Sequence, residues 1–195
     1  MDENIPERRN VINALYDRRT VSVFGLVVML TIILGGCQRS EPVLNPAQKS
    51  FKQDMRETID RITTGISAPL SRRDVKGTQA KLMEVMPDNA KLCGKCPFRV
   101  AVLDRNAIGV AACPHGPNQG KDFSNYDTIQ KVPKNRRIAQ KELYFQDGGV
   151  IYAIVAPILA AQEVVGVLTL ALTQEDIKRY WDLSPQEYSQ VDLNR

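Results

Sequence analysis

Three cysteines and the single histidine of this chain have a spacing that could hold a metal ion. Cys93 and Cys96 form a Cys-x-x-Cys pair, and Cys113 stands two residues before His115. Thiolate and imidazole groups are the ligands that tetrahedral zinc prefers. Cys93, Cys96, Cys113 and His115 are therefore a candidate metal site, and zinc is the candidate cofactor.

A predicted hairpin would bring the two halves of this set together. If the chain turns at Arg105-Asn106, the numbers of facing residues add up to about 211. Cys113 then faces Phe98, and His115 lies near Cys96. The sequence therefore predicts that the three thiols and the imidazole gather at one corner of a sheet.

The same thiols allow two other chemistries. In an exported protein a disulfide is favoured, either within the Cys93–Cys96 pair or from one of these residues to Cys113, and each pairing leaves an odd thiol. A redox-active pair is the third alternative. Haem attachment is excluded because Pro97 stands where a histidine is needed, and the βαβ context of thioredoxin-like proteins is missing.

Enzymatic motifs are missing from the sequence. It contains no nucleophile elbow, phosphate-binding loop or zinc-protease helix. The one histidine lies in a proline-rich loop, and nothing places a serine beside it as a nucleophile. We therefore expect no catalytic residues and a protein that is not an enzyme.

The N-terminal segment has the pattern of a secretory signal. Arg18 and Arg19 precede an apolar run, Val21–Leu34, of about 14 residues, which is short for a membrane span. Small residues follow and end at Cys37. Leu34-Gly35-Gly36-Cys37 resembles the lipobox of bacterial lipoproteins, whereas an uncleaved signal anchor is the alternative.

The lipobox resemblance implies the following processing and location. Cys37 receives a diacylglyceryl group, the signal peptide 1–36 is removed, and 37–45 becomes a lipidated tether to a domain that spans 46–195. The protein is then anchored in the bilayer of the cell envelope and faces the periplasm. Gln38 favours the outer membrane slightly over the inner membrane, because aspartate at this position is typical of inner-membrane retention.

Composition indicates one ordinary globular domain after the leader. The chain has 195 residues and a net charge of +4, and the first 36 residues contain four basic and four acidic residues, so the net charge belongs to the remainder. Basic residues cluster only briefly, as in 134–137, which is too small a footprint for nucleic acid.

Helical signals come first. Asn45, Pro46 and Gln48 form a predicted capping box and first turn, and an apolar stripe follows at helical spacing. Gly65 and Pro69 are expected to end this helix, and a second capping box over 71–74 opens another helix that Pro87 stops. The stripe consists of Phe51, Met55, Ile59, Ile62 and Ile66.

Strand signals dominate the second half. Short apolar runs predict strands at 98–103, 108–113, 141–146, 150–158 and 164–172, with a short helix that ends before Pro133 and a final helix from about 174. Most links between the strands are too short for parallel crossovers. We therefore predict an α+β domain, in which a long N-terminal helix packs on a five-stranded antiparallel sheet.

The order of these segments resembles that of Cache domains, which are PAS-like sensor domains outside the cytoplasm. Val102–Asn106 followed by Ile108–Val110 resembles their first hairpin, and Asp122–Tyr126 resembles the segment before their pocket helix. The stretches 147–158 and 164–168 resemble their last three strands. The resemblance spans about 46–182, and it implies a single Cache domain.

The Cache resemblance also implies a small-molecule ligand, commonly a carboxylate or amino acid, bound on one face of the sheet beneath 114–140. The candidate ligand-binding residues are Tyr126, Arg137, Tyr144 and Tyr152. Tyr144 and Tyr152 face each other only if their hairpin has a three-residue loop. The tyrosine–arginine–tryptophan cluster of amino-acid-binding members is missing, which leaves the ligand class open.

These features support competing functions. The first is a membrane-anchored, ligand-binding sensory lipoprotein without its own output domain, which would need a signalling partner in the membrane. The second is a metal-binding or thiol-redox lipoprotein that uses Cys93, Cys96, Cys113 and His115. The third is a structural envelope protein whose sheet docks a partner.

Overall fold

The computed structural model describes residues 43–86, 98–116, 118–144 and 149–194, which belong to one domain. The predicted lipidation site Cys37 and the pair Cys93 and Cys96 lie outside the described residues. In chain order the elements are α2 (Pro46–Ser71), α3 (Val75–Val85), β1 (Arg99–Asp104), β2 (Gly109–Cys113), α5 (Asp127–Asn135), β3 (Ala139–Tyr144), β4 (Val150–Ala160), β5 (Glu163–Thr173), α6 (Gln174–Trp181) and α7 (Pro185–Ser189).

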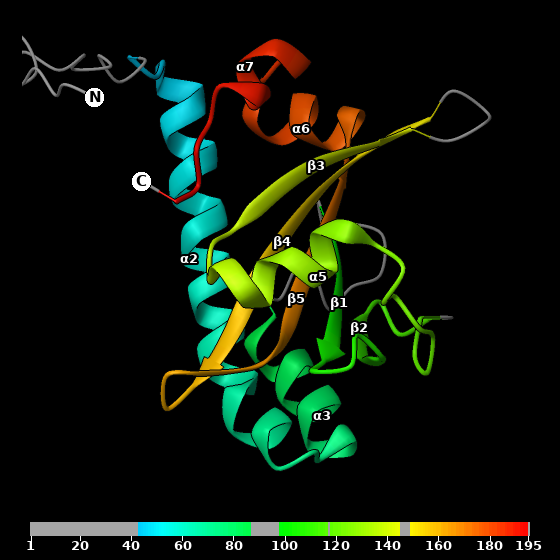
Figure 1. Ribbon diagram of the computed structural model, residues 1–195. Coiled ribbons are helices and arrows are strands. Elements are labelled where there is room, and N and C mark those ends of the chain that lie inside the picture. The colour runs from blue at the N-terminus through cyan, green and yellow to red at the C-terminus, as the bar shows by residue number, and fades with distance from the viewer. Residues whose placement is uncertain (1–42, 87–97, 117, 145–148, 195) are drawn as a thin grey trace, which may run out of the picture. The chain divides into compact units, whose positions relative to one another are not determined.

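The five strands form one antiparallel sheet in the order β2-β1-β5-β4-β3. The helix α2 runs along one face of this sheet, and the short helix α5 crosses the other face (Figure 1). The helices α6 and α7 lie beside the start of α2, and α3 lies near its far end. The predicted α+β fold, with a long N-terminal helix on a five-stranded antiparallel sheet, is confirmed.

The helix α2 forms and packs as its sequence pattern predicts. The Asn45 side chain accepts a hydrogen bond from the Gln48 N–H, and the Gln48 side chain accepts one from the Asn45 N–H, which completes the capping box. The predicted stripe is at most 4% exposed and consists of Phe51, Met55, Ile59, Ile62 and Ile66.

Among the helices that the structure describes, none combines the length and the hydropathy that a membrane span requires.

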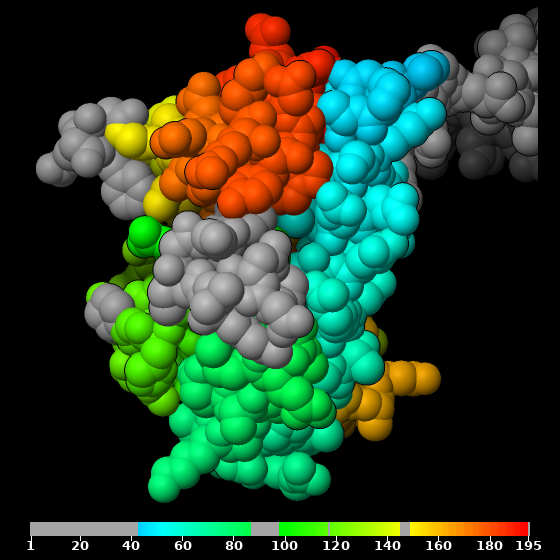
Figure 2. All heavy atoms as spheres, turned by 180° about the vertical axis from the view of Figure 1, so that it is seen from behind, coloured from blue at the N-terminus to red at the C-terminus, as the bar shows by residue number. Residues whose placement is uncertain are grey.

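The helices α2, α3, α6 and α7 together cover the face of the domain that is opposite to α5. Figure 2 shows α2, the green α3 and the orange α6–α7 region on this side. Buried side chains of these helices and of the facing strands form one cluster, which is the main core of the domain. Burying one such aliphatic or aromatic side chain stabilises a fold by roughly 1.5–3 kcal/mol.

Two prolines lie inside helices that the sequence predicted they would end. Pro69 removes the N–H that would bond to the carbonyl of Gly65, yet α2 continues two residues further. Both Pro69 and Leu70 are buried in the core. Pro133 likewise lies within α5, directly after the buried Val132. In both helices the burial of neighbouring side chains offsets the loss of one backbone hydrogen bond.

The helix α3 begins three residues later than the predicted capping box. Ser71 is still the last residue of α2, and Arg73 adopts a left-handed conformation with φ of 58° that turns the chain. Asp74 is the N-cap instead, and its side chain accepts a hydrogen bond from the Gly77 N–H at 2.8 Å. The predicted cap at Ser71 was therefore wrong, because the turn between the helices is very short.

The register of the β1–β2 hairpin differs by two from the prediction. Cys113 faces Val100 rather than Phe98. Ala107 has a φ of 65° and adds a third residue to the turn, and Val110 is an extra residue where the pairing shifts. Each of these features moves the pairing by one residue, so the expected facing of Cys113 and Phe98 was wrong.

Side-chain carboxamides satisfy backbone groups at both edges of the sheet. At the β2 edge, the Gln79 side chain donates to the Ala112 carbonyl and accepts from the Ala112 N–H, both at 3.0 Å. Just before β3, the Asn194 side chain makes the same pair of bonds with Ile138, both at 2.8 Å. The C-terminal segment is therefore fixed beside the connection from α5 to β3 (Figure 1).

We predict that Gln79→Ala lowers the free energy of unfolding by about 2 kcal/mol, because it leaves two backbone groups of the buried Ala112 without partners. Urea unfolding of the purified protein measures this change. The matched control is Gln53→Ala, which removes a side chain that bonds only to the exposed Glu57. The free energy of unfolding of this control variant should differ from that of the parent protein by less than about 0.5 kcal/mol. Equal losses for the two variants would contradict the edge role of Gln79.

Candidate ligand-binding site

The face of the sheet beneath α5 holds a cavity of about 450 Å³. Its floor follows from the strand registers. Lys141 of β3 pairs with Ala153 of β4, and Ala153 pairs in turn with Ala171 of β5. The neighbouring row of the floor consists of Val155, Thr169 and Ala101.

Short side chains make this floor concave. Three of its residues are alanines from three different strands, Ala101, Ala153 and Ala171. Because α5 has only nine residues, it covers a limited part of the face. The sheet surface beside the helix is therefore left hollow instead of being filled by the core.

The roof of the cavity comes from the segment that leads into α5. The rings of Phe123 and Tyr126 lie 6.1 Å apart between centroids, and both line the cavity. Tyr126 is 53% exposed, so its ring lies at the mouth. Asn118 and Asn125 add carboxamide groups to the same wall.

This roof is attached to the edge of the sheet by backbone contacts. The Phe123 N–H donates to the Ala107 carbonyl, and the Gly109 N–H donates to the Lys121 carbonyl, both at 2.9 Å. A Cβ atom at Gly109 would lie 2.0 Å from the Asn118 carbonyl oxygen, so the close approach requires glycine. The roof is thus connected to β2 through the main chain.

The helix α5 itself is held by a small second core. Ile129 and Val132 pack against Leu103, Val155 and Val167 of the sheet. This cluster contains six buried residues, far fewer than the main core on the α2 side. The floor of the cavity is therefore anchored by the whole sheet, whereas the roof depends on few contacts.

The cavity lining is mainly apolar, with few polar groups. The Thr169 hydroxyl donates to the Ala101 carbonyl at 3.1 Å, and its oxygen can still accept a hydrogen bond. The carboxylate of Asp127 is exposed and accepts a hydrogen bond from Lys131 at 2.9 Å. That bond and the charge of Lys131 lower the pKa of Asp127, and Lys141 adds a smaller effect in the same direction. Lys141 is the cationic side chain of the floor.

Tyr126 and Tyr152, two of the predicted ligand-binding residues, lie on opposite sides of the sheet. Tyr126 lines the cavity. Tyr152 is 3% exposed on the α2 side, with its ring centroid 4.6 Å from that of Tyr188. Tyr152 pairs with Glu142 across the two strands, and the last pair before the loop is Tyr144 with Val150. The loop between β3 and β4 is therefore longer than the three residues that would place Tyr152 opposite Tyr144. The position of Tyr152 is therefore a core position.

The other two candidates lie outside the cavity lining. Tyr144 is 74% exposed at the end of β3, and its hydroxyl donates to the carboxylate of Glu142. Side chains alternate along β3, so Tyr144 lies on the face opposite to Leu143, which does line the cavity. Arg137 is exposed just after α5. Of the four predicted ligand contacts, the structure brings Tyr126 alone to this cavity.

The structure describes two of the four residues of the predicted metal site. Cys113 is buried in β2, and His115 is exposed after that strand. Within the described ranges, no three His, Cys, Asp or Glu side chains form a group that could hold a metal ion. Because Cys93 and Cys96 lie outside those ranges, the zinc and disulfide hypotheses stay predictions.

Solved structures with low sequence identity are similar to this domain. The extracellular domain of vpHK1S-Z8, described as a histidine kinase, has a TM-score of 0.51 and 13% identity, with 86% of this chain and 65% of that chain covered. The Campylobacter jejuni chemoreceptor Tlp3 with isoleucine bound has a TM-score of 0.49 and 13% identity, covering 85% and 66%. The sensor domain of the V. cholerae histidine kinase DctB has a TM-score of 0.45 and 13% identity, covering 70% and 61%.

These neighbours are sensor domains of the Cache type, and this chain spans about two thirds or less of the length of each. No family model matches the sequence, and a comparison with curated proteins finds no significant relative. The described domain has the fold of a Cache sensor domain, which confirms the resemblance seen in its sequence.

The burial of the Tyr188 hydroxyl predicts a pH dependence of stability. Burial raises the pKa of Tyr188 to about 12, whereas the Gln140 side chain acts in the opposite direction. An unfolded tyrosine has a pKa of about 10, so the unfolded chain loses this proton first as the pH rises. Below pH 10 both states keep the proton, and between pH 10 and 12 folding becomes less favourable by up to about 1.4 kcal/mol per pH unit.

We therefore expect Tyr188→Phe to flatten the fall in the free energy of unfolding between pH 10 and 12, as measured by urea unfolding at a series of pH values. The control variant is Tyr180→Phe, at a residue that is 41% exposed. The control should keep the slope of the parent protein. A slope that stays unchanged in Tyr188→Phe would show that this hydroxyl is not protected by the fold.

Proposed function

We propose that this protein is a non-enzymatic sensor that binds a small organic ligand in the cavity between α5 and the sheet. The observation that carries the proposal is the cavity of about 450 Å³, because it is concave, mainly apolar and lined by a few convergent polar groups. It lies on the face of the sheet where the Cache resemblance implied a ligand.

The lining favours a ligand with an apolar body and one polar end. Ala153, Val155 and Ile151 offer apolar surface, whereas the polar groups lie toward the mouth, at Tyr126 and Lys141. A ligand group with negative charge or hydrogen-bond acceptors would meet the Lys141 ammonium group. The carboxylate of Asp127 already has a partner in Lys131, which makes it a weaker counterpart for a ligand ammonium group.

The location and the output of this sensor belong to the same proposal. The lipobox-like sequence that ends at Cys37 supports export, acylation and attachment to an envelope membrane, with the domain facing the periplasm. A short tether before α2 would keep the domain near the bilayer. A membrane protein that recognises the ligand-bound form is the partner such a sensor requires.

A ligand screen with a cavity-filling variant tests the proposal. Thermal-shift measurements on the purified full chain with small carboxylates, amino acids and purines should reveal a class that raises the unfolding temperature. Ala153→Trp places a large side chain in the centre of the floor, so the affinity for that class should fall about tenfold or more.

The matched control is Ala80→Trp, which adds the same side chain at an exposed position of α3. It should bind like the parent protein. A screen without any stabilising class would contradict the proposed function. Full affinity in a folded Ala153→Trp variant would show instead that the ligand binds elsewhere.

Acylation is tested separately. In bacterial cells, Cys37→Ser should abolish lipid attachment and leave the leader uncleaved before residue 37, because the thiol is the predicted acceptor. Mass spectrometry of the N-terminal peptide and detergent phase partitioning measure both effects. The control is Cys113→Ser, whose lipid modification should equal that of the parent protein. An unacylated N-terminus in the parent protein would contradict the lipoprotein assignment.

A further inference from the structure

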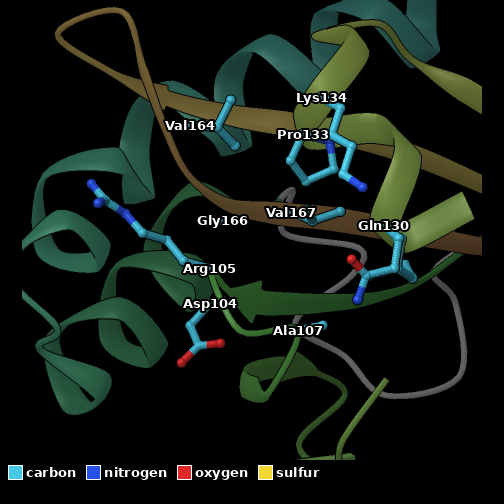
Figure 3. A pocket seen from close by; sticks show the side chains of 10 residues that line it. Asp104, Arg105, Ala107, Gln130, Pro133, Lys134, Val164, Gly166 and Val167 are labelled. Atoms are coloured by element: carbon cyan, nitrogen blue, oxygen red, sulfur yellow. The ribbon is translucent and has the colours of Figure 1, made fainter. Parts of the chain in front are cut away.

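A second hollow, of about 250 Å³, lies on the same face of the sheet at the other end of α5. Figure 3 shows Pro133 and Lys134 of α5 on one side and the start of β5, with Val164 and Val167, beside them. The turn between β1 and β2 closes the opposite side with Ala107 and Arg105.

The surface around this hollow is rich in cations. Lys134, Arg136 and Arg137 are exposed at the C-terminal end of α5, and no acidic side chain of the described residues forms an ion pair with them. Arg105 pairs with Glu163 at 3.2 Å. The side chains of this pair are 53% and 75% exposed, and such pairs contribute little to stability.

The acidic group at this hollow is already engaged. The Asp104 carboxylate accepts hydrogen bonds from the N–H groups of Asn106 and Ile108, at 2.8 and 2.9 Å, within the hairpin turn. Among the described residues no carboxylate pairs with Lys134, and Figure 3 shows its amine and the Gln130 amide on the α5 side. An incoming anion would therefore find an available ammonium group.

We propose that this hollow is a second binding site, for a small carboxylate with a short branched apolar tail. The tail would pack on Pro133, Val164 and Val167, and the carboxylate would bind the Lys134 ammonium group. Figure 3 shows the Arg105 guanidinium on the side of the hollow away from Lys134, so Arg105 would supply a second charge by leaving Glu163 and turning toward the ligand. Leaving Glu163 is a small loss, because that pair is exposed.

The test uses isobutyrate as the probe and isobutyramide, a neutral molecule of the same shape, as the matched control ligand. Each is titrated into the full chain labelled with ¹⁵N, and backbone amide shifts are followed by NMR. Isobutyrate should shift the amides of Ala107, Gly166 and Val167 saturably, whereas isobutyramide should bind at least tenfold more weakly, because it lacks the charge.

Variants then assign the binding to this hollow. Lys134→Gln and Arg105→Gln should each weaken isobutyrate binding about tenfold or more. Lys121→Gln removes the same charge at an exposed residue that lines neither cavity, and it should bind like the parent protein. Lys141→Gln changes only the larger cavity, so it should also leave these shifts in place.

Three results would overturn the proposal. The first is a set of shifts confined to residues of the larger cavity, such as Ala153 and Thr169. The second is equal binding of isobutyrate and isobutyramide. The third is unchanged affinity in both Lys134→Gln and Arg105→Gln.

Discussion

The packing of α2 on one face of the sheet is the constraint on which the rest of the domain depends. Phe51, Ile62 and Ile66 are completely buried there, together with Ile154 and Leu170 of the central strands. This large core stabilises the sheet mainly from one side, and the small core beneath α5 adds fewer contacts on the other. The other face is therefore free to carry small residues and a short helix without loss of the fold, which is the physical basis for a cavity in so small a domain.

Much of the architecture follows from local sequence signals because those signals agree with the packing. The spacing of Phe51, Met55 and Ile59 predicts the buried face of α2, and the capping box at Asn45 forms as its sequence indicates. Short apolar runs likewise predict the strands to within a few residues. Periodicity is informative here because burial selects one face of each element.

Long-range pairing is where sequence reasoning failed, and the causes are local. The left-handed Ala107 and the extra Val110 each shift the β1–β2 register by one residue, and neither is glycine or another residue that signals such a feature. At the next hairpin a longer loop places Tyr152 opposite Glu142, with its ring in the main core. A tyrosine is a plausible ligand contact by residue type, but the register of its strand determines which face of the sheet its ring lies on.

The cavity floor was missed for a different reason. Ala153, Ala171 and Thr169 have small, uncharged side chains that line the cavity. An alanine in a strand does not by itself indicate that a cavity lies above it. Their importance comes from lying side by side on three strands, which depends on register. Lys141 could have been found, because it lies two residues from Leu143 in β3 and therefore shares its face, which lines the cavity.

The pair of hydrogen bonds between Asn194 and Ile138 has a consequence for communication within the molecule. Ile138 connects the helix above the larger cavity to the strand that carries Lys141, and the bonded carboxamide belongs to the last residues of the chain. Val191 and Leu193 keep that segment buried beside α2. Any displacement of α5 would thus be passed to a segment that is anchored beside α2, so a dye attached near Asn194 would respond to ligand binding in the cavity.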